Sequence, residues 1–110
     1  LEIPAGKLDL PGEDPVAAAG RELEEEVGLR AESLEQIASF WTSPGFSYVY
    51  MWIYLATDLT QVEVRPQGAE EEVAEIVRIP LSEVPARLAA GEFDDAKTLV
   101  GLGALAARLD

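Results

Sequence analysis

A chain of 110 residues with 48% hydrophobic residues can bury one core, so we expect a single globular domain spanning residues 1–110. Eight basic against 21 acidic residues give a net charge of −13, which disfavours nucleic acid and anionic membranes as partners. The sequence has no cysteine and no histidine, which excludes disulfides, thiolate nucleophiles and imidazole zinc sites and leaves carboxylates, lysine, tyrosine or a bound metal ion.

No apolar stretch approaches the roughly 20 residues that a membrane-spanning helix needs, and no basic segment precedes a short apolar one. We therefore expect no membrane partner and a cytoplasmic location. The chain begins at Leu1 rather than at a methionine, as though inside a strand. We expect an N-terminal part of the protein to be missing.

The first elements are predicted from turn and cap residues. Residues 1–4 are typical of a short strand, and residues 5–13 form a loop with two glycines and a proline. Asp14 suits a helix N-cap, Pro15 suits the first helical turn, and Gly28 suits the position just past a helix end. These signals predict a helix over residues 15–27.

Two strands are predicted next, over residues 34–42 and 47–56. Aromatic and aliphatic residues alternate in the second, which makes it apolar on both faces and predicts a central strand covered on each side. Its aromatic residues could stack on a base, but we expect them in the core: Tyr48, Tyr50, Trp52 and Tyr54.

The rest of the chain is predicted to contain a polar loop over residues 58–71, a strand over residues 73–79, and helices over residues 81–90 and 94–109. Gly101 and Gly103 lie inside the last helical pattern. They lack the strand and the third glycine of a dinucleotide-binding motif, so we do not assign them to one.

Carboxylates gather on one side of the first predicted helix. At 100° per residue Glu22, Glu25 and Glu26 cluster, and Glu24 points elsewhere. Such spacing is common on solvated helix faces, which is the ordinary interpretation. These side chains repel one another and oppose the helix dipole, at about a few tenths of a kcal/mol each, with only Arg21 to offset them. A cation explains them better, since Mg²⁺ binds one or two carboxylates together with waters and phosphate oxygens.

The same residues resemble the Nudix box, whose pattern is G-x5-E-x7-R-E-U-x-E-E-x-G-U with U an aliphatic residue. Eight of its nine positions match in register: Glu13, Arg21, Glu22, Leu23, Glu25, Glu26, Gly28 and Leu29. The ninth departs, because six residues separate Gly6 from Glu13 where the pattern has five. The resemblance implies the Nudix fold of the α/β (α+β) class, an α/β/α sandwich with a mixed β-sheet.

The resemblance also implies roles for these residues. Glu22, Glu25 and Glu26 would ligate Mg²⁺ or Mn²⁺, Arg21 would orient one of these carboxylates, and Glu13 would support the cluster from the loop. The carbonyl before the first box glycine binds metal in related pyrophosphatases, and here it belongs to Ala5. Gly28 has the equal interpretation of an ordinary helix stop.

Within the family, a proline about fifteen residues after the box marks the ADP-ribose pyrophosphatase group, and Pro44 follows Leu29 by fifteen residues. Residues 43–47 and 1–6 also resemble that group, which implies substrate contacts from Gly6, Pro44, Gly45 and Phe46. The group usually continues with acidic residues where this chain has Tyr48 and Val49. Without the resemblance, Ser-Pro-Gly would be an ordinary turn.

The acidic segment over residues 68–72 matches the place where this group carries a glutamate that helps to activate water. Its spacing from the next predicted strand favours Glu72, with Glu71 second. An acidic surface loop is an equal interpretation.

The resulting hypothesis is metal-dependent hydrolysis of a nucleoside diphosphate linked to another group, with ADP-ribose cleaved to AMP and ribose 5-phosphate as the first choice. Three alternatives are another nucleotide sugar or dinucleoside polyphosphate as substrate, a non-catalytic nucleotide-binding Nudix-like domain, and a purely structural acidic domain. The resemblance also implies a homodimer, in which N-terminal strands absent here are often exchanged and contribute to base recognition.

Overall fold

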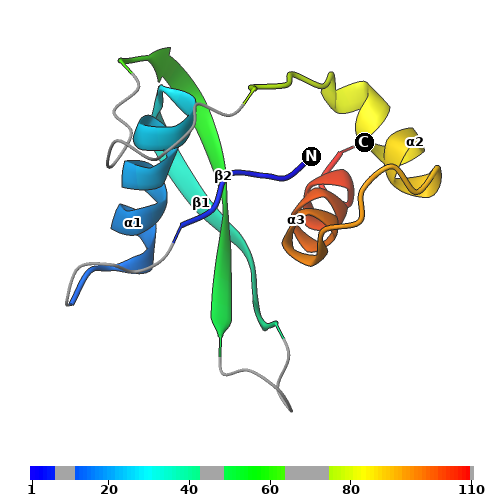
Figure 1. The fold of residues 1–110 in the computed structure, drawn as a ribbon, viewed down its shortest axis with the longest axis horizontal. Helices are drawn as coiled ribbons and strands as arrows, with labels where there is room; N and C mark the ends of the chain where they lie inside the picture. The colour runs from blue at the N-terminus through cyan, green and yellow to red at the C-terminus, as the bar shows by residue number, and fades with distance from the viewer. Residues whose placement is uncertain (7–11, 43–48, 64–74, 110) are drawn as a thin grey trace. The chain divides into compact units, whose positions relative to one another are not determined.

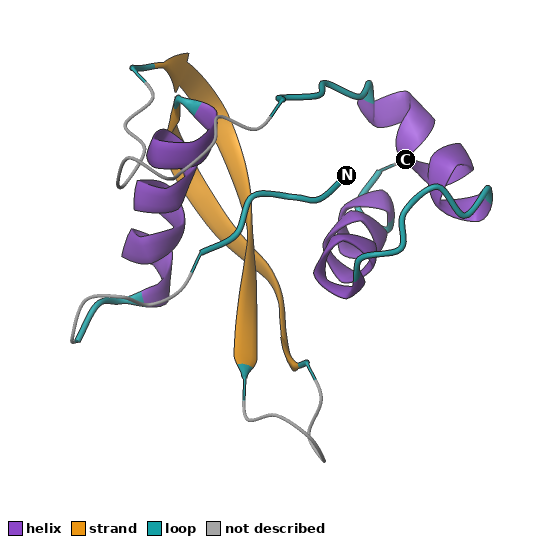
Figure 2. Cartoon of the chain, in the orientation of Figure 1, coloured by secondary structure: helices purple, strands orange, loops and turns teal. Residues whose placement is uncertain are grey.

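The computed structural model describes residues 1–6, 12–42, 49–63 and 75–109. In chain order its elements are helix α1 (Pro15–Glu22), the π-helical turn η1 (Leu23–Val27), strands β1 (Leu29–Trp41) and β2 (Tyr50–Gln61), the 3-10 turn η2 (Leu81–Glu83), and helices α2 (Val84–Ala89) and α3 (Ala96–Ala106). Figures 1 and 2 show these helices and the pair of strands, which confirms the predicted α+β class. No helix in the described ranges is both long and apolar enough to cross a membrane.

The chain divides into two units. One comprises Leu1–Ile3, Gln36–Ile53 and Arg78–Asp110, and the other comprises Pro4–Glu35 and Tyr54–Val77. The first unit contains four of the buried side chains: Ile53, Val84, Phe93 and Thr98. In the second unit Ala18 and Gly28 are buried. That the chain forms one domain stays a prediction.

Helix α1 begins and ends as its cap residues predict. The Asp14 carboxylate accepts a hydrogen bond from the amide of Val16 at 3.2 Å, and Pro15 occupies the first turn. Helical backbone continues through η1 to Gly28, which has φ 73° and ends the helix in the left-handed conformation. The predicted helix over residues 15–27 is therefore confirmed, with its last five residues in a wider π-helical turn.

Strands β1 and β2 form a two-stranded antiparallel sheet. The amide of Val62 donates to the carbonyl of Gly28 at 2.8 Å, and the amide of Thr42 donates to the carbonyl of Val49 at 3.0 Å. The strands predicted over residues 34–42 and 47–56 exist, but β1 begins at Leu29 and β2 continues to Gln61. Pairing with the start of β1 extends β2 past Asp58, a residue type that is depleted in strands.

The prediction that the second strand is central and covered on both faces is not borne out. Among the described residues, β2 pairs only with β1. Trp52 is 36% exposed, and residues 57–61 are exposed. The sheet that the structure describes is antiparallel rather than mixed.

Two predicted strands are wrong in their described parts. Residues 1–4 belong to no strand, because the amide of Ile3 donates to the side-chain hydroxyl of Thr98 instead of to a neighbouring strand. Residues 75–79 also belong to no strand, and residues 73 and 74 lie outside the described ranges.

The C-terminal helices are shorter than predicted. The segment over residues 81–90 begins as the turn η2 and becomes helical only at α2, where Pro85 fits the first turn because that position needs no amide donor. Asp95, rather than Asp94, caps α3, since its carboxylate accepts the amide of Thr98 at 3.0 Å. As predicted, Gly101 and Gly103 lie within this helix.

Candidate active site

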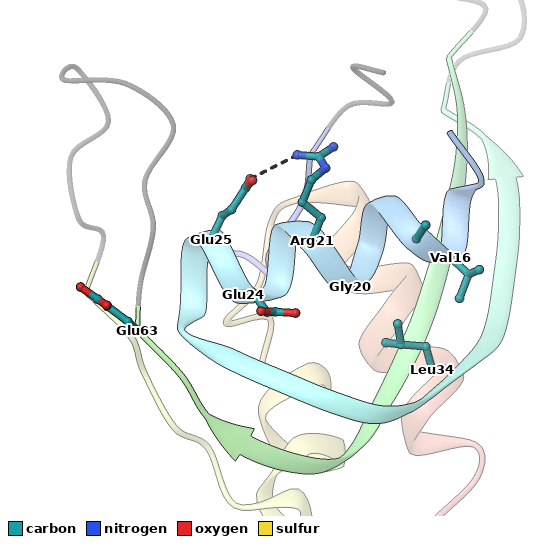
Figure 3. A pocket seen from close by; sticks show the side chains of 8 residues that line it. Val16, Gly20, Arg21, Glu24, Glu25, Leu34 and Glu63 are labelled. Carbon is teal, nitrogen blue, oxygen red and sulfur yellow. Dashed lines mark hydrogen bonds and ion pairs between the residues drawn. The ribbon is translucent and has the colours of Figure 1, made fainter. Parts of the chain in front are cut away.

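Arg21 lies among three carboxylates, one each from α1, from η1 and from the loop before α1. Its Nε and Nη2 atoms donate to the two carboxylate oxygens of Glu13 at 3.1 and 3.0 Å. Its Nη1 atom donates to Glu22 at 3.1 Å and to Glu25 at 3.2 Å, the second of which appears as the dashed line in Figure 3. One planar guanidinium therefore bridges the loop and two turns of the helix, which a lysine ammonium could not do with the same geometry.

These contacts are sheltered from solvent. The side chain of Arg21 is 19% exposed, and those of Glu13, Glu22 and Glu25 are 8, 14 and 17% exposed. The hydrogen bond to Glu13 raises the pKa of Arg21 above its ordinary value, with burial acting in the opposite direction. The guanidinium is therefore charged at neutral pH.

Burial raises the pKa of Glu22, and the negative charge of Glu26 raises it further. Glu25 adds to this effect, whereas the charge of Arg21 opposes it. The charges of Glu25 and Glu26 thus act on the Glu22 carboxylate. A cation near them would relieve this repulsion.

Glu24 makes a different contact. Its carboxylate accepts a hydrogen bond from Nη2 of Arg30 at 3.1 Å, in a pair whose side chains are 38 and 64% exposed. The Glu24 carboxylate is therefore paired with Arg30 of β1 rather than with Arg21. This agrees with the prediction that Glu24 points away from Glu22, Glu25 and Glu26.

Gly6 lies directly against the side chain of Glu22. A Cβ atom at position 6 would overlap the carboxyl carbon and Oε1 of Glu22. Ala5, the predicted carbonyl ligand, precedes this point of contact and is partly exposed. The structure thus places the backbone of residues 5 and 6 beside the carboxylate cluster. Residues 7–11, which contain part of the six-residue spacing to Glu13, lie outside the described ranges.

The described carboxylates fit a magnesium site in their chemistry. No group of three or more of them is arranged to enclose a metal ion within the part of the chain that the structure describes. Mg²⁺ needs only one or two carboxylates, because waters and substrate phosphates complete its octahedral shell. Glu22 and Glu25, each bonded through one oxygen to Arg21, are suitable donors, and Glu22 also lies against the backbone of Gly6.

An open cavity of about 470 Å³ lies beside α1 (Figure 3). Its apolar side contains the stripe of Val16 and Gly20, and its polar rim contains Arg21 and Glu25. It is lined by Val16, Ala17, Gly20, Arg21, Glu24, Glu25, Leu34 and Glu63. Val16 and Gly20 are four residues apart and so share one face of α1, whereas nothing in the sequence indicates Leu34 or Glu63.

Several predicted site residues lie outside the described ranges, namely Pro44, Gly45, Phe46, Glu71 and Glu72. The aromatic residues of β2 are not the fully buried core that the sequence predicts, since Trp52 is exposed and Tyr50 and Tyr54 are half-buried, while Tyr48 lies outside the described ranges. Tyr50 packs edge to face against both Trp41 and Trp52, at 5.0 Å between ring centroids in each pair. Trp41 is 49% exposed, so this row of rings lies at the surface of its unit.

Comparison with known proteins agrees with this arrangement. The ADP-ribose pyrophosphatase of Bacillus subtilis (strain 168) is 41% identical over 98 residues, which are 89% of this chain and 52% of that protein. The methanol dehydrogenase activator of Bacillus methanolicus is 38% identical over 102 residues, 93% of this chain and 55% of that protein. A crystal structure of an ADP compounds hydrolase superposes with a TM-score of 0.75 at 33% identity, covering 86% of this chain and 50% of that one.

The chain therefore spans about half the length of the relatives that it matches. The family model of the NUDIX domain matches residues 1–100. Together with the carboxylates around Arg21, this match shows that the chain belongs to the Nudix family.

Proposed function

We propose that this chain carries the catalytic helix of a metal-dependent Nudix pyrophosphohydrolase that acts on a nucleoside diphosphate linked to another group. The observation that carries the proposal is the arrangement of Glu13, Glu22 and Glu25 around Arg21 on the box helix. ADP-ribose is the substrate that we propose, because a similar protein is an ADP-ribose pyrophosphatase and a similar structure is an ADP compounds hydrolase.

In this proposal Glu22, Glu25 and Glu26, with the carbonyl of Ala5, hold Mg²⁺ or Mn²⁺. The bound ion would neutralise the diphosphate, lower the pKa of a bound water and stabilise the leaving phosphate. Water adds to one phosphorus, the bridging P–O bond breaks, and AMP and ribose 5-phosphate leave. Glu72, or Glu71, is the proposed acceptor of the proton that this water loses.

The chain's own residues would keep the carboxylates in place during this reaction. Arg21 holds one oxygen of Glu22 and one of Glu25, and its bidentate contact with Glu13 fixes the guanidinium. Because these contacts are largely buried, the two carboxylates need little reorganisation when a cation binds. Gly6, Pro44, Gly45 and Phe46 are proposed to contact substrate. A homodimer and a cytoplasmic location stay predictions.

The direct test is Mg²⁺-dependent or Mn²⁺-dependent release of AMP from ADP-ribose. We expect Glu26→Gln to lower kcat by more than about 100-fold, since even residues that only support metal ligands cost 10- to 100-fold. Glu24→Gln is the matched control on the same helix, because the Glu24 carboxylate pairs with Arg30. Full activity of Glu26→Gln would refute the role of Glu26 as a metal ligand. Absence of AMP release by the wild-type protein would refute the assignment of ADP-ribose as its substrate.

A second function is favoured by one observation, the 38% identity to a methanol dehydrogenase activator. In this second function, the chain binds a nucleotide in a regulatory role without hydrolysing it. Calorimetry with ADP-ribose in Mg²⁺ distinguishes the two functions, because binding without hydrolysis favours the regulatory one. If hydrolysis does occur, kcat/KM values for a panel of nucleotide sugars and dinucleoside polyphosphates identify the preferred substrate.

A further inference from the structure

The cavity beside α1 is built from one unit of the chain alone. All the residues that line it belong to the unit formed by Pro4–Glu35 and Tyr54–Val77. Its volume of about 470 Å³ lies within the range of roughly 300–1,000 Å³ that is typical of small-molecule sites. The proposed metal site shares only Arg21 and Glu25 with it. The other lining residues have no role in that site.

Gly20 keeps the wall of this cavity open. It lies inside α1, where glycine is less favourable than alanine. Its φ angle is not in the left-handed region, and a Cβ atom there would meet the described chain only at Cδ1 of Leu34, at an ordinary contact distance of 3.4 Å. Neither the backbone nor close packing therefore accounts for this glycine. Its missing side chain leaves space that belongs to the cavity.

The two ends of the cavity differ in chemistry. Figure 3 shows Val16 and Leu34 toward the start of α1, and Glu25 and Glu63 toward its other end. The first end offers aliphatic surface, and the second offers carboxylate oxygens. A ligand that fits both ends has an apolar body and a polar group at one end of it.

The charge of that polar group follows from the residues on the rim. The guanidinium of Arg21 already donates to three carboxylates, and Glu24 is paired with Arg30. Glu63, just past the end of β2, is exposed and has no ion-pair partner among the described residues. The unit also contains most of the chain's 21 acidic residues. This end of the cavity therefore attracts a cation and repels an anion such as a phosphate group.

We propose that the cavity binds a small organic cation, in which a primary ammonium group is attached to an apolar body. The apolar body lies against Val16, Gly20 and Leu34, and the ammonium group donates hydrogen bonds to Glu25 and Glu63. An ammonium ion has three donors and no acceptor, which suits a rim of carboxylates. This inference does not rest on the proposed function, because it requires neither a metal ion nor hydrolysis.

The ligand class is tested with three probes that share an apolar body and differ in charge, namely phenethylammonium, 2-phenylethanol and phenylacetate. We expect calorimetry at neutral pH to show the lowest Kd for phenethylammonium, weaker binding of 2-phenylethanol and no binding of phenylacetate. The Kd of phenethylammonium should rise with ionic strength, because salt screens exposed carboxylates. Equal affinity for the three probes, or no binding of phenethylammonium, would overturn the proposal.

The same ammonium group ends a lysine side chain, so Nα-acetyl-lysine amide is a fourth probe. We expect it to bind more weakly than phenethylammonium, because its methylene chain has less apolar surface to bury than a ring. Tighter binding of the lysine derivative would overturn the assignment to a small free amine.

Two variants locate the probe. Gly20→Ala narrows the cavity, and we expect it to raise the Kd of phenethylammonium by about 10-fold, as for a misfit of one methyl group in an apolar pocket. Glu63→Gln removes a charge from the rim and should raise the Kd by about fivefold, the effect of one charge pair at about 4 Å in water.

Each variant has a matched control. Gly103→Ala changes a helix glycine outside the cavity, and Glu32→Gln changes an exposed glutamate that does not line it. Both should keep the wild-type Kd. NMR provides a second readout, since the bound probe should shift the methyl resonances of Val16 and Leu34. Binding with the same Kd in all four variants, or without these shifts, would place the probe elsewhere and overturn the proposal.

Discussion

Gly6 and Glu22 are in direct contact, and the contact depends on the missing side chain at position 6. A Cβ atom there would occupy the same space as the carboxyl group of Glu22. The described glycines with positive φ are Gly12, Gly28 and Gly91, so the φ angle of Gly6 is one that alanine can also adopt. The glycine is therefore needed for space rather than for an unusual backbone angle.

Gly6→Ala should consequently act on Glu22 rather than on the backbone. We expect the added methyl group to push the Glu22 carboxylate aside and to raise the Mn²⁺ concentration needed for half-maximal activity by about 10-fold or more. The unfolding midpoint should also fall, because the methyl group would overlap Cγ as well as the carboxyl group of Glu22 and so displace its hydrogen bond with Arg21. Titration of activity with Mn²⁺ measures the effect, and unchanged metal dependence would contradict it.

Arg21→Lys tests the guanidinium bridge. A lysine ammonium cannot make the bidentate contact with Glu13 and also bond to Glu22 and Glu25, so the carboxylates should lose their fixed positions. We expect kcat to fall by about 10- to 100-fold and the thermal midpoint to fall.

The control for this variant is Arg30→Lys, which changes an exposed ion pair with Glu24. We expect it to stay within about twofold of wild type, since exposed ion pairs contribute little. Equal losses of kcat in Arg21→Lys and Arg30→Lys would show that the contacts of Arg21 with the three carboxylates have no special role in activity.

The helix from Asp14 to Gly28 could be predicted because its signals are local. An N-cap, a first-turn proline and a left-handed glycine each act within a few residues, and the structure shows all three. The bond between Arg21 and Glu25 follows from the same helical spacing. The contact of Arg21 with Glu13 could be inferred only through the resemblance to the Nudix box.

The predictions that were wrong concern segments whose structure depends on contacts with distant parts of the chain. The full length of β2 depends on pairing with β1, whereas Asp58, a residue type depleted in strands, suggests the start of a loop. The first residues form no described strand because Ile3 bonds to Thr98, 95 residues away. The closeness of Gly6 to Glu22 could be inferred only through the resemblance, which assigns the Ala5 carbonyl and Glu22 to one metal site, since no periodicity relates a loop residue to a helix side chain.

Gly103→Ala should stabilise the protein. Gly103 lies inside α3, is exposed, and leaves open space for a Cβ atom. Alanine reduces the conformational entropy of the unfolded chain, so we expect the free energy of unfolding to rise by about 0.5–1 kcal/mol. Gly101→Ala should not show this gain, because its methyl group would meet Ile3 at 3.1 Å. Urea denaturation measures the free energy of unfolding of both variants. An equal rise in Gly101→Ala and Gly103→Ala would contradict the close contact between Gly101 and Ile3.

Asp95 should make the start of α3 sensitive to acid. Its carboxylate accepts hydrogen bonds from Nζ of Lys97 at 2.9 Å and from the amide and hydroxyl of Thr98. The bond from Lys97 is the largest cause, followed by those from Thr98, of a pKa below the ordinary value of Asp95. A carboxylate with a lowered folded-state pKa stabilises the fold at pH values above its unfolded pKa, which is about 3.9. That stabilisation is lost as the pH falls through the lower, folded-state pKa.

Asp95→Asn isolates this contribution, because asparagine can still cap the helix but does not titrate. We expect the free energy of unfolding, measured in urea between pH 7 and pH 3, to fall less steeply below about pH 4 in Asp95→Asn than in wild type. The charge of Lys97, which faces both Glu2 and Asp95, is constant over this range, so it does not obscure the comparison. Parallel pH profiles for the two proteins would show that the Asp95 carboxylate has the same pKa folded and unfolded.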